Sequence, residues 1–195
     1  MKYIKDRNLN GLINLIFYFS FWVKIRIYSF LKILILNFNG NEISYSVIIF
    51  PGSQIYNYIG GGKIYISKNT IIHHGSKILT YGGNIHIGKN CSLNSYSIIQ
   101  SSTGNLIIES DVRIGSLTHI VSANHVYGKD ILVRKKTKSD GIKISENTWI
   151  GSSVVITDGT HIFKNSVIAA NSIVRGKLTK SGVYAGSPAK LIKEL

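Results

Sequence analysis

The stretch "ISENTWIGSSVVITDGTHIFKNSVIAANSIV", residues 144–174, decides the fold of this chain. A branched aliphatic residue recurs in it at every sixth position: Ile144, Ile150, Ile156, Ile162, Ile168 and Val174. An α-helix places its apolar residues three or four positions apart, so a period of six excludes a helix here. The pattern indicates short strands joined by tight turns, with one inward aliphatic side chain on each side of a coil.

The same ladder continues upstream in groups of three. The groups are Ile66, Ile72 and Ile78; Ile87, Leu93 and Ile99; and Ile108, Ile114 and Ile120. Each group begins 21 residues after the previous one, so every coil has three six-residue sides and three extra residues. The extra residues, "GGK" at 61–63, "GGN" at 82–84 and "TGN" at 103–105, predict a bulge at one corner. A fainter copy begins at "GNE", 40–42, and puts Ile43 in the place of Ile64 and Ile85.

The residues between the rungs suit the turns that such coils need. They read "SKN", "GKN", "SEN" and "FKN", and Gly, Asn and Ser either tolerate a left-handed backbone or cap their own turns. Stacked coils bury each aliphatic residue on the one below, which no single coil could do. The prediction is an all-β chain, a parallel β-helix of triangular hexapeptide-repeat coils. We divide it into a helical, apolar segment at 1–40, the β-helix at 41–178 and a tail at 179–195.

Composition narrows the function without choosing it. The chain has 195 residues, 44% of them hydrophobic, which is enough for the core of one domain. Cys91 is the only cysteine, which excludes an internal disulfide and a thiolate zinc cluster and makes the cytoplasm the expected location. A net charge of +14 predicts attraction to nucleic acid, membrane phospholipid, an acidic polymer or a phosphorylated cofactor.

One insertion interrupts the ladder between Ile120 and Ile144. We place an excluded loop at 122–141; it is polar and carries Lys129, Arg134, Lys135, Lys136 and Lys138. Loops held at their base by a rigid solenoid commonly carry function. His125 stands at the mouth of this loop, and histidine is well suited to act as a general base near neutral pH. The alternative is a surface histidine with no role.

Residues 12–38 are apolar and aromatic but are interrupted by Lys24, Arg26 and Lys32. The longest uncharged run, 11–23, is shorter than the roughly 20 residues that span a bilayer. Basic residues precede this run as in a signal peptide, but no small-residue cleavage site follows it. Two interpretations stay open: a helix that caps the end of the solenoid, or an interfacial helix that makes a peripheral membrane contact with anionic lipid.

The six histidines raise a metal hypothesis as well. His119 and His125 are six residues apart and are expected on consecutive sides of the prism, while His73, His74 and His86 lie coils below. Three imidazoles and a water would form an open zinc site, as in a carbonic anhydrase. No carboxylate recurs near these histidines to orient them, so we predict no metal site.

Three segments, taken in order, resemble a known family. "THIVSANH" (118–125), residues 144–178 and "VYAGSPAKLIKEL" (183–195) are similar to hexapeptide-repeat acetyltransferases, in the branch of galactoside, maltose and capsule O-acetyltransferases. The resemblance covers residues 85–195 and hardly touches the first 60. It implies a left-handed β-helix, a homotrimer with its sites in the clefts between subunits, and acetyl-CoA as the donor.

The resemblance also assigns candidate residues. It makes His125 the general base and Asn94 the acceptor-binding residue. It assigns the acetyl-CoA site to Trp149, Ser152, Ala170, Arg175, Lys190 and Lys193. Trp149 is expected to project outward, backbone N–H groups beside Ser152 are expected to stabilise the oxyanion, and Ala170 leaves room for the pantetheine arm. Where the family commonly has Thr-Lys, this chain has Arg175-Gly176, which weakens the assignment of a phosphate contact there.

The expected function is acetyl transfer from acetyl-CoA to a carbohydrate hydroxyl. The basic loop and the apolar N-terminus favour an anionic or membrane-linked acceptor, such as a capsular or lipopolysaccharide sugar at the inner face of the membrane. N-acetylation of an amino sugar and a zinc protein of the carbonic anhydrase type are the alternatives. A scaffold or nucleic-acid binder is a further one, although the repeats lack the interleaved aromatic and basic residues that stack bases.

Overall fold

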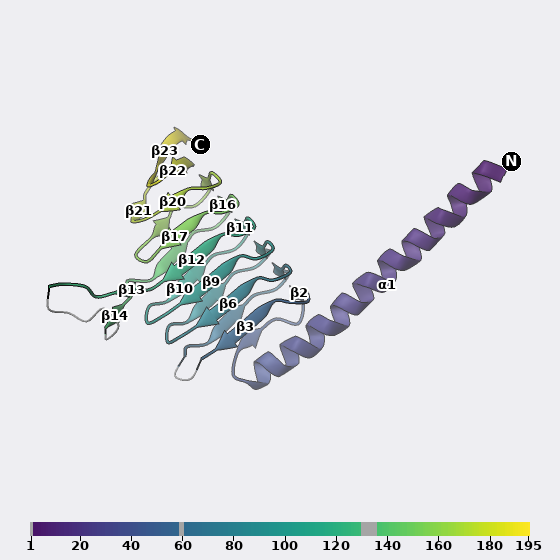
Figure 1. Cartoon of the computed structure of the whole chain (residues 1–195), viewed down its shortest axis with the longest axis horizontal. Coiled ribbons are helices and arrows are strands. Elements are labelled where there is room, and N and C mark those ends of the chain that lie inside the picture. The colour runs from purple at the N-terminus through teal and green to yellow at the C-terminus, as the bar shows by residue number, and fades with distance from the viewer. Residues whose placement is uncertain (1, 59–60, 130–135) are drawn as a thin grey trace.

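The computed structural model describes the backbone of residues 2–58, 61–129 and 136–195, and their side chains except those of 2–10, 12 and 13. A long helix, α1 (Lys2–Phe38), precedes a triangular β-solenoid whose three faces are parallel sheets (Figure 1). The predicted fold class is confirmed: the chain is a left-handed parallel β-helix of hexapeptide repeats with one excluded loop.

We call the three faces sheets A, B and C, in the order in which each coil visits them. Sheet A contains β1 (Glu42–Ile43), β4 (Ile64–Ile66), β7 (Ile85–Ile87), β10 (Leu106–Ile108), β15 (Ile142–Ile144), β18 (His161–Ile162) and β21 (Lys177–Leu178). Sheet B contains β2 (Ile48–Ile49), β5 (Ile71–Ile72), β8 (Ser92–Leu93), β11 (Arg113–Ile114), β16 (Trp149–Ile150), β19 (Val167–Ile168), β22 (Gly182–Gly186) and β23 (Ala189–Glu194). Sheet C contains β3 (Gln54–Asn57), β6 (Lys77–Thr80), β9 (Ile98–Ser101), β12 (His119–Ser122), β17 (Val155–Thr157) and β20 (Ile173–Val174).

The ladder residues fill the interior as predicted. Every rung from Ile144 to Val174 is fully buried, and the upstream rungs from Ile66 to Ile120 are at most 2% exposed. Parallel strand pairing stacks ladder residues from the same position of successive coils: Ile114 pairs with Ile150, and Ile150 with Ile168. The core is therefore one continuous aliphatic column, and each coil depends on its neighbours for burial.

In the corner that follows sheet A, the left-handed residue is asparagine in four coils and Asp111 in one. Asn69, Asn90, Asn147 and Asn165 all have a positive φ between 53° and 60°. Their side chains also bond along the stack, for example Asn147 Nδ2 to Asn165 Oδ1 at 2.8 Å. The expectation that these residues supply a left-handed turn is confirmed, because asparagine accepts this backbone and its amide can bond the next coil.

The register predicted for the first coil is wrong. Ile43 pairs with Ile66 and not with the column of Ile64 and Ile85, and Ile49 pairs with Ile72 in the same way. The first coil is therefore longer than the 21-residue coils above it. The extra length falls in the corner before sheet A, where residues 59 and 60 lie outside the described part of the chain.

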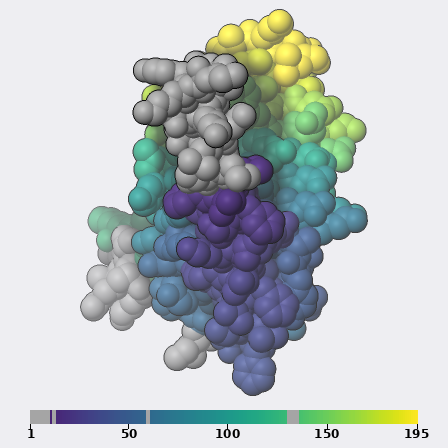
Figure 2. Space-filling model, turned by 90° about the vertical axis from the view of Figure 1, so that its right-hand side faces the viewer, coloured from purple at the N-terminus to yellow at the C-terminus, as the bar shows by residue number. Residues whose placement is uncertain are grey.

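Helix α1 covers the first coil with its C-terminal half and leaves the solenoid with its N-terminal half (Figure 1). Ile25, Ile33 and Leu36 are buried against the coil, and the Ser29 hydroxyl both donates to Ile49 O and accepts from Ile49 N. This half closes the open end of the core, as the capping interpretation predicts. Figure 2 looks from the side to which α1 projects and shows the C-terminal residues, in yellow, at the other end of the solenoid from the first coil.

Candidate functional site

Two edges of the prism carry the candidate residues. The BC edge consists of the corners that lead from sheet B to sheet C, residues 94–97, 115–118, 151–154 and 169–172. The CA edge consists of the corners that lead from sheet C to sheet A, residues 123–129, 136–141, 158–160 and 175–176 of the described chain. Sheet C lies between them, and a four-residue strand such as β12 spans about 13 Å. Residues on different edges of one chain are therefore well separated.

The BC edge brings three predicted residues onto one line. Asn94, Ser152 and Ala170 each lie in a corner that directly follows a strand of sheet B. Ser152 and Ala170 are exposed and belong to adjacent coils, in which Asn171 N donates to Ser152 O at 3.0 Å. The coils are packed tightly, since a Cβ at Gly151 would lie 2.6 Å from the Ala170 nitrogen. Small residues at this corner leave an open, narrow strip of surface.

The amides around Ser152 differ in their availability. Gly151 N donates to Ile168 O at 2.8 Å and Ser153 N donates to Ser116 O at 2.9 Å, so both hold coils together. The expectation that the flanking N–H groups stabilise an oxyanion is therefore not supported by this geometry. For the Ser152 amide, no hydrogen bond is found within the described part of the chain.

The same edge carries backbone strain that the sequence did not reveal. Tyr96 and Leu117 occupy equivalent positions in adjacent coils of this edge. Both have φ of 62° and both are 62% exposed. A bulky residue in this conformation is a genuine outlier, and such outliers cluster at functional sites. The Tyr96 ring occupies the space where a Cβ at Gly75 would be. Tyr96 is thus a surface candidate beside Asn94 that periodicity could not predict.

The CA edge carries the excluded loop and His125. Strand β13 (Asn124–His125) pairs antiparallel with β14 (Thr137–Lys138), so the loop begins and ends as a hairpin that stands off the prism (Figure 1). His125 is exposed on this hairpin. The expectation that His119 and His125 lie on consecutive sides of the prism is wrong, because only His119, on β12, belongs to a face. Arg175 is exposed on the CA edge too, next to Gly176 with φ of 74°.

Sheet B and the C-terminal residues form a third group. Trp149 is 59% exposed and projects outward as predicted, and it borders a pocket of about 390 Å³. Residues 182–194 are not a plain tail: β22 continues sheet B and β23 folds back on it. Pairing places Trp149 beside Val167, Val167 beside Val183 and Val183 beside Lys193. Trp149 and Lys193 thus share one row, about 14 Å apart at the usual strand spacing. Lys190 is exposed on the same strand as Lys193.

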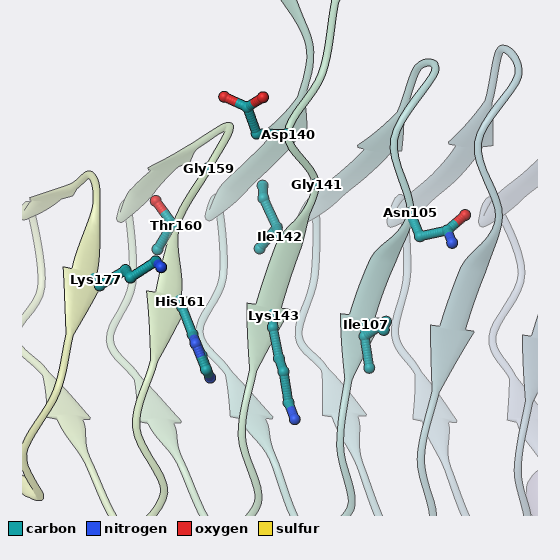
Figure 3. A pocket seen from close by; sticks show the side chains of 10 residues that line it. All are labelled: Asn105, Ile107, Asp140, Gly141, Ile142, Lys143, Gly159, Thr160, His161 and Lys177. Carbon is teal, nitrogen blue, oxygen red and sulfur yellow. The ribbon is translucent and has the colours of Figure 1, made fainter.

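A further pocket, of about 380 Å³, lies on sheet A where the excluded loop returns to the solenoid (Figure 3). Asp140 and Gly141 line it on the loop side, and Lys143, His161 and Lys177 line it from the strands and corner of sheet A. Lys143 is paired with Glu109 at 2.8 Å, and this ion pair lowers the pKa of the Glu109 carboxyl. The pocket is therefore polar and of mixed charge.

The histidines do not form a metal centre in the described part of the chain. Among the residues that the structure describes, no three His, Cys, Asp or Glu side chains are grouped to hold an ion. His119 is half-buried on sheet C, and its burial lowers the pKa of the imidazole. Burial likewise raises the pKa of the Cys91 thiol, which keeps it protonated and unreactive at neutral pH.

Comparison of the sequence with known proteins finds similarity to acetyltransferases. No protein-family model matches the chain. Residues of the chain are 40% identical over 57 positions to the putative lipopolysaccharide biosynthesis O-acetyltransferase of Escherichia coli K12, covering 29% of each protein. They are 48% identical over 54 positions to the galactoside O-acetyltransferase of the same organism, covering 28% of this chain and 27% of that one. The chain is a homologue of the hexapeptide-repeat acetyltransferases. The matched segments span less than a third of these two relatives.

Solved structures of other acyltransferases share the fold of this chain. A putative acetyltransferase of Bacillus cereus superposes with a TM-score of 0.64 at 23% identity, covering 80% of this chain and 78% of that one. The N-acyltransferase AntD of Bacillus cereus, solved with dTDP and coenzyme A, superposes with a TM-score of 0.57 at 24% identity and covers 76% and 80%. At these identities the likeness concerns the solenoid alone.

This acetyltransferase homologue has one more polar centre, which sequence reasoning missed. Asp158, on the CA edge, accepts hydrogen bonds from both ends of the excluded loop. The available signal was a change of residue type: the coils below have Thr80, Ser101 and Ser122 at the end of their sheet C strands, and this coil has an aspartate directly after β17.

Proposed function

We propose that this protein transfers the acetyl group of acetyl-CoA to a carbohydrate hydroxyl, with His125 as the general base. The observation that carries the proposal is the exposed His125 on a hairpin that a rigid hexapeptide solenoid holds off its surface. The relatives named above are O-acetyltransferases, which supports the acyl-transfer chemistry.

The reaction needs no covalent enzyme intermediate. The imidazole of His125 takes the proton of the acceptor hydroxyl while the hydroxyl oxygen attacks the thioester carbonyl. The C–S bond then breaks, and the CoA thiolate leaves and is protonated by the imidazolium. The negative charge that develops on the carbonyl oxygen requires a hydrogen-bond donor in the site, and the Ser152 amide is one donor that the BC edge can offer.

The two edges support a site shared between subunits. A base and an oxyanion donor must both lie about 3 Å from the reacting groups, whereas one chain holds His125 and Ser152 on different edges. In a homotrimer with cyclic symmetry, the CA edge of one subunit can face the BC edge of the next. We therefore place each of three identical sites between the hairpin of one subunit and Asn94, Ser152 and Ala170 of its neighbour.

Acetyl-CoA would lie along the coils of that neighbour. Ala170 leaves the strip beside Ser152 open for the pantetheine arm, and Trp149 offers an exposed ring for packing against it. Lys190 and Lys193 extend the path toward the C-terminal end, where cationic groups suit the CoA phosphates. Arg175 is assigned the remaining phosphate contact from the CA edge. AntD, which shares the fold, was solved with coenzyme A.

The acceptor is proposed to be a sugar of a cell-surface polysaccharide. One relative is named for lipopolysaccharide biosynthesis, and Lys129, Lys136 and Lys138 are exposed on the loop that carries His125. Arg134 and Lys135 lie outside the described residues. An amine acceptor is the second candidate, because AntD is an N-acyltransferase.

We also propose that α1 lies at the inner face of the membrane. Arg26 and Lys32 donate to Ser46 O and Ser53 O, so they are held by the solenoid. The opposite face of the helix is apolar and exposed: Val23, Ile27, Phe30, Leu31, Leu34 and Phe38. Among the described residues, no helix has both the length and the apolar character of a membrane crossing. Contact with a lipid surface, favoured by the charge of +14, would cover this face.

Release of free thiol from acetyl-CoA tests the catalytic proposal. Wild type and His125→Ala are compared on sialylated, uronic-acid, neutral and amino sugars. Loss of the base should lower turnover about 10²- to 10⁴-fold and leave CoA binding intact. The proposal is refuted if wild type releases no thiol with any acceptor class, or if the two proteins turn over equally fast. Acetylation of amino sugars alone would favour the second candidate, an amine acceptor.

A further inference from the structure

One carboxylate, that of Asp158, accepts five hydrogen bonds at the foot of the excluded loop, where the Ser122 and Ser139 hydroxyls also bond each other at 2.6 Å. Asp158 Oδ1 accepts from Ser139 Oγ at 2.8 Å, Gly141 N at 3.0 Å and Ser122 Oγ at 3.3 Å. Its Oδ2 accepts from Asp140 N at 2.9 Å and Asn124 Nδ2 at 3.1 Å. Two of these five donors lie at the start of the loop and three at its end, so this side chain joins the outgoing and returning segments.

The chemistry of this corner explains why the residue is an acid. In the coils below, the hydroxyls of Thr80 and Ser101 donate to the carbonyls of Gly83 and Gly104, which closes the corner. Where the loop returns, the corner instead presents two backbone N–H groups, those of Asp140 and Gly141. A carboxylate only accepts, and its two oxygens have room for all five donors, whereas a hydroxyl oxygen accepts at most two bonds, as Thr80 Oγ1 does from Gly62 N and Gly82 N.

The corner of the next coil is shaped to bring the carboxylate there. Gly159 follows Asp158 with φ of 75°, and Gly159 N donates to Gly141 O at 2.8 Å. Figure 3 shows Gly159 and Gly141 in the corners before two neighbouring strands, β18 and β15, with Asp140 above Gly141 where the chain returns from the loop. Asp158 is therefore fixed to the same corner by its own backbone neighbour.

The clamp reaches His125 through one residue. Asn124 bonds Asp158 through its side chain, and Asn124 and His125 form strand β13, paired with Lys138 and Thr137. Successive side chains of a strand point to opposite faces. With Asn124 held against the solenoid, the His125 side chain is directed to the other face of the hairpin. Val126 N also donates to Lys136 O at 2.9 Å, so the hairpin continues beyond the histidine.

We infer that Asp158 is a positioning residue, which fixes the foot of the hairpin and so sets the direction in which His125 meets the acceptor. This inference rests on the proposed function. Asp158 contacts neither acceptor nor acetyl-CoA in this account, and its effect on turnover is exerted through Asn124 and the returning strand.

The test compares Asp158→Asn with Asp111→Asn, the same chemical change at an exposed corner where the carboxylate accepts one bond, from Asn90. An asparagine at 158 keeps the shape but replaces one acceptor oxygen with a donor that faces N–H groups. Hydrogen exchange of peptides covering 122–141 reports the clamp, and steady-state kinetics report positioning. We expect exchange at least about 10-fold faster and kcat about 10- to 100-fold lower for Asp158→Asn, with KM for acetyl-CoA within about twofold. Asp111→Asn should match wild type in both.

A second variant keeps the inference open to refutation if Asp158→Asn fails to fold. Asn124→Ala removes the bond from the Asn124 side chain to Asp158, so kcat should fall while exchange at 139–141 stays at the wild-type level. Unchanged exchange in Asp158→Asn, or an unchanged kcat in either variant, overturns the positioning role. If wild type transfers no acetyl group, the proposed function fails and the positioning role with it, while the exchange data still decide whether Asp158 holds the loop.

Discussion

Replacing one rung of the aliphatic column tests how the solenoid holds its edges in place. Ile150 is fully buried between Ile114 and Ile168, one residue after Trp149 and two before Ser152. Ile150→Ala removes three carbon atoms, a transfer term of about 2.4 kcal/mol at roughly 0.8 kcal/mol each. Neighbouring coils are fixed by the ladder hydrogen bonds and cannot collapse fully, so a cavity term adds about 1 kcal/mol.

The expected loss is therefore about 3 to 4 kcal/mol, which corresponds to roughly 10 °C in Tm for a chain of this size. Val155→Ala is the matched control, because Val155 lies on the outer face of sheet C and is 38% exposed. It should cost less than about 1 kcal/mol. Thermal and urea unfolding followed by far-ultraviolet circular dichroism measure both variants. Equal destabilisation by the two substitutions would refute the column as the source of stability.

Three further predictions concern the cofactor path and pH. The double variant Lys190→Ala/Lys193→Ala should raise KM for acetyl-CoA about 10-fold with little change in kcat. The difference in KM between the variant and wild type should shrink at high salt. An unchanged KM would show that these lysines do not bind acetyl-CoA. Ala170→Leu should abolish acetyl-CoA binding in calorimetry while Tm stays within a few degrees, and normal binding would contradict an arm beside Ser152. Burial lowers the pKa of His119 below 6.5, so the folded state resists its protonation and stability falls as pH drops below 6.5. His119→Leu should therefore lose less Tm than wild type between pH 7.5 and 5, and an equal loss in both proteins would contradict this.

The architecture followed from the sequence because its signal is local and repeated. Each inward rung needs only its place in a six-residue period, so Ile144 to Val174 could be placed without knowledge of any partner residue. The first coil was misplaced for the same reason. Ile43 follows the period but belongs to a coil of different length, and the six-residue period does not reveal the length of the corner between β3 and β4.

The candidate site was less accessible to such reasoning. Asp158 and Asn124 are 34 positions apart, and their contact depends on how the loop re-enters the stack. The strain at Tyr96 is likewise a property of the folded corner, since nothing in the period marks a tyrosine for a left-handed backbone. His125 and Ser152 were predicted as parts of one site in a cleft between subunits, and a single chain holds them on two edges. What would bring them together is another copy of the same chain.

Mixed trimers test this central claim most directly. His125→Ala and Ala170→Leu subunits, each carrying a different affinity tag, are co-expressed, and trimers that carry both tags are isolated. In a cyclic trimer of two subunit types, one of the three directed interfaces pairs an intact hairpin with an intact BC edge, so about one third of the wild-type acetyl transfer should return. Both parent variants alone should be inactive. Mixed trimers as inactive as their parents would show that each site lies within one chain and would contradict the account.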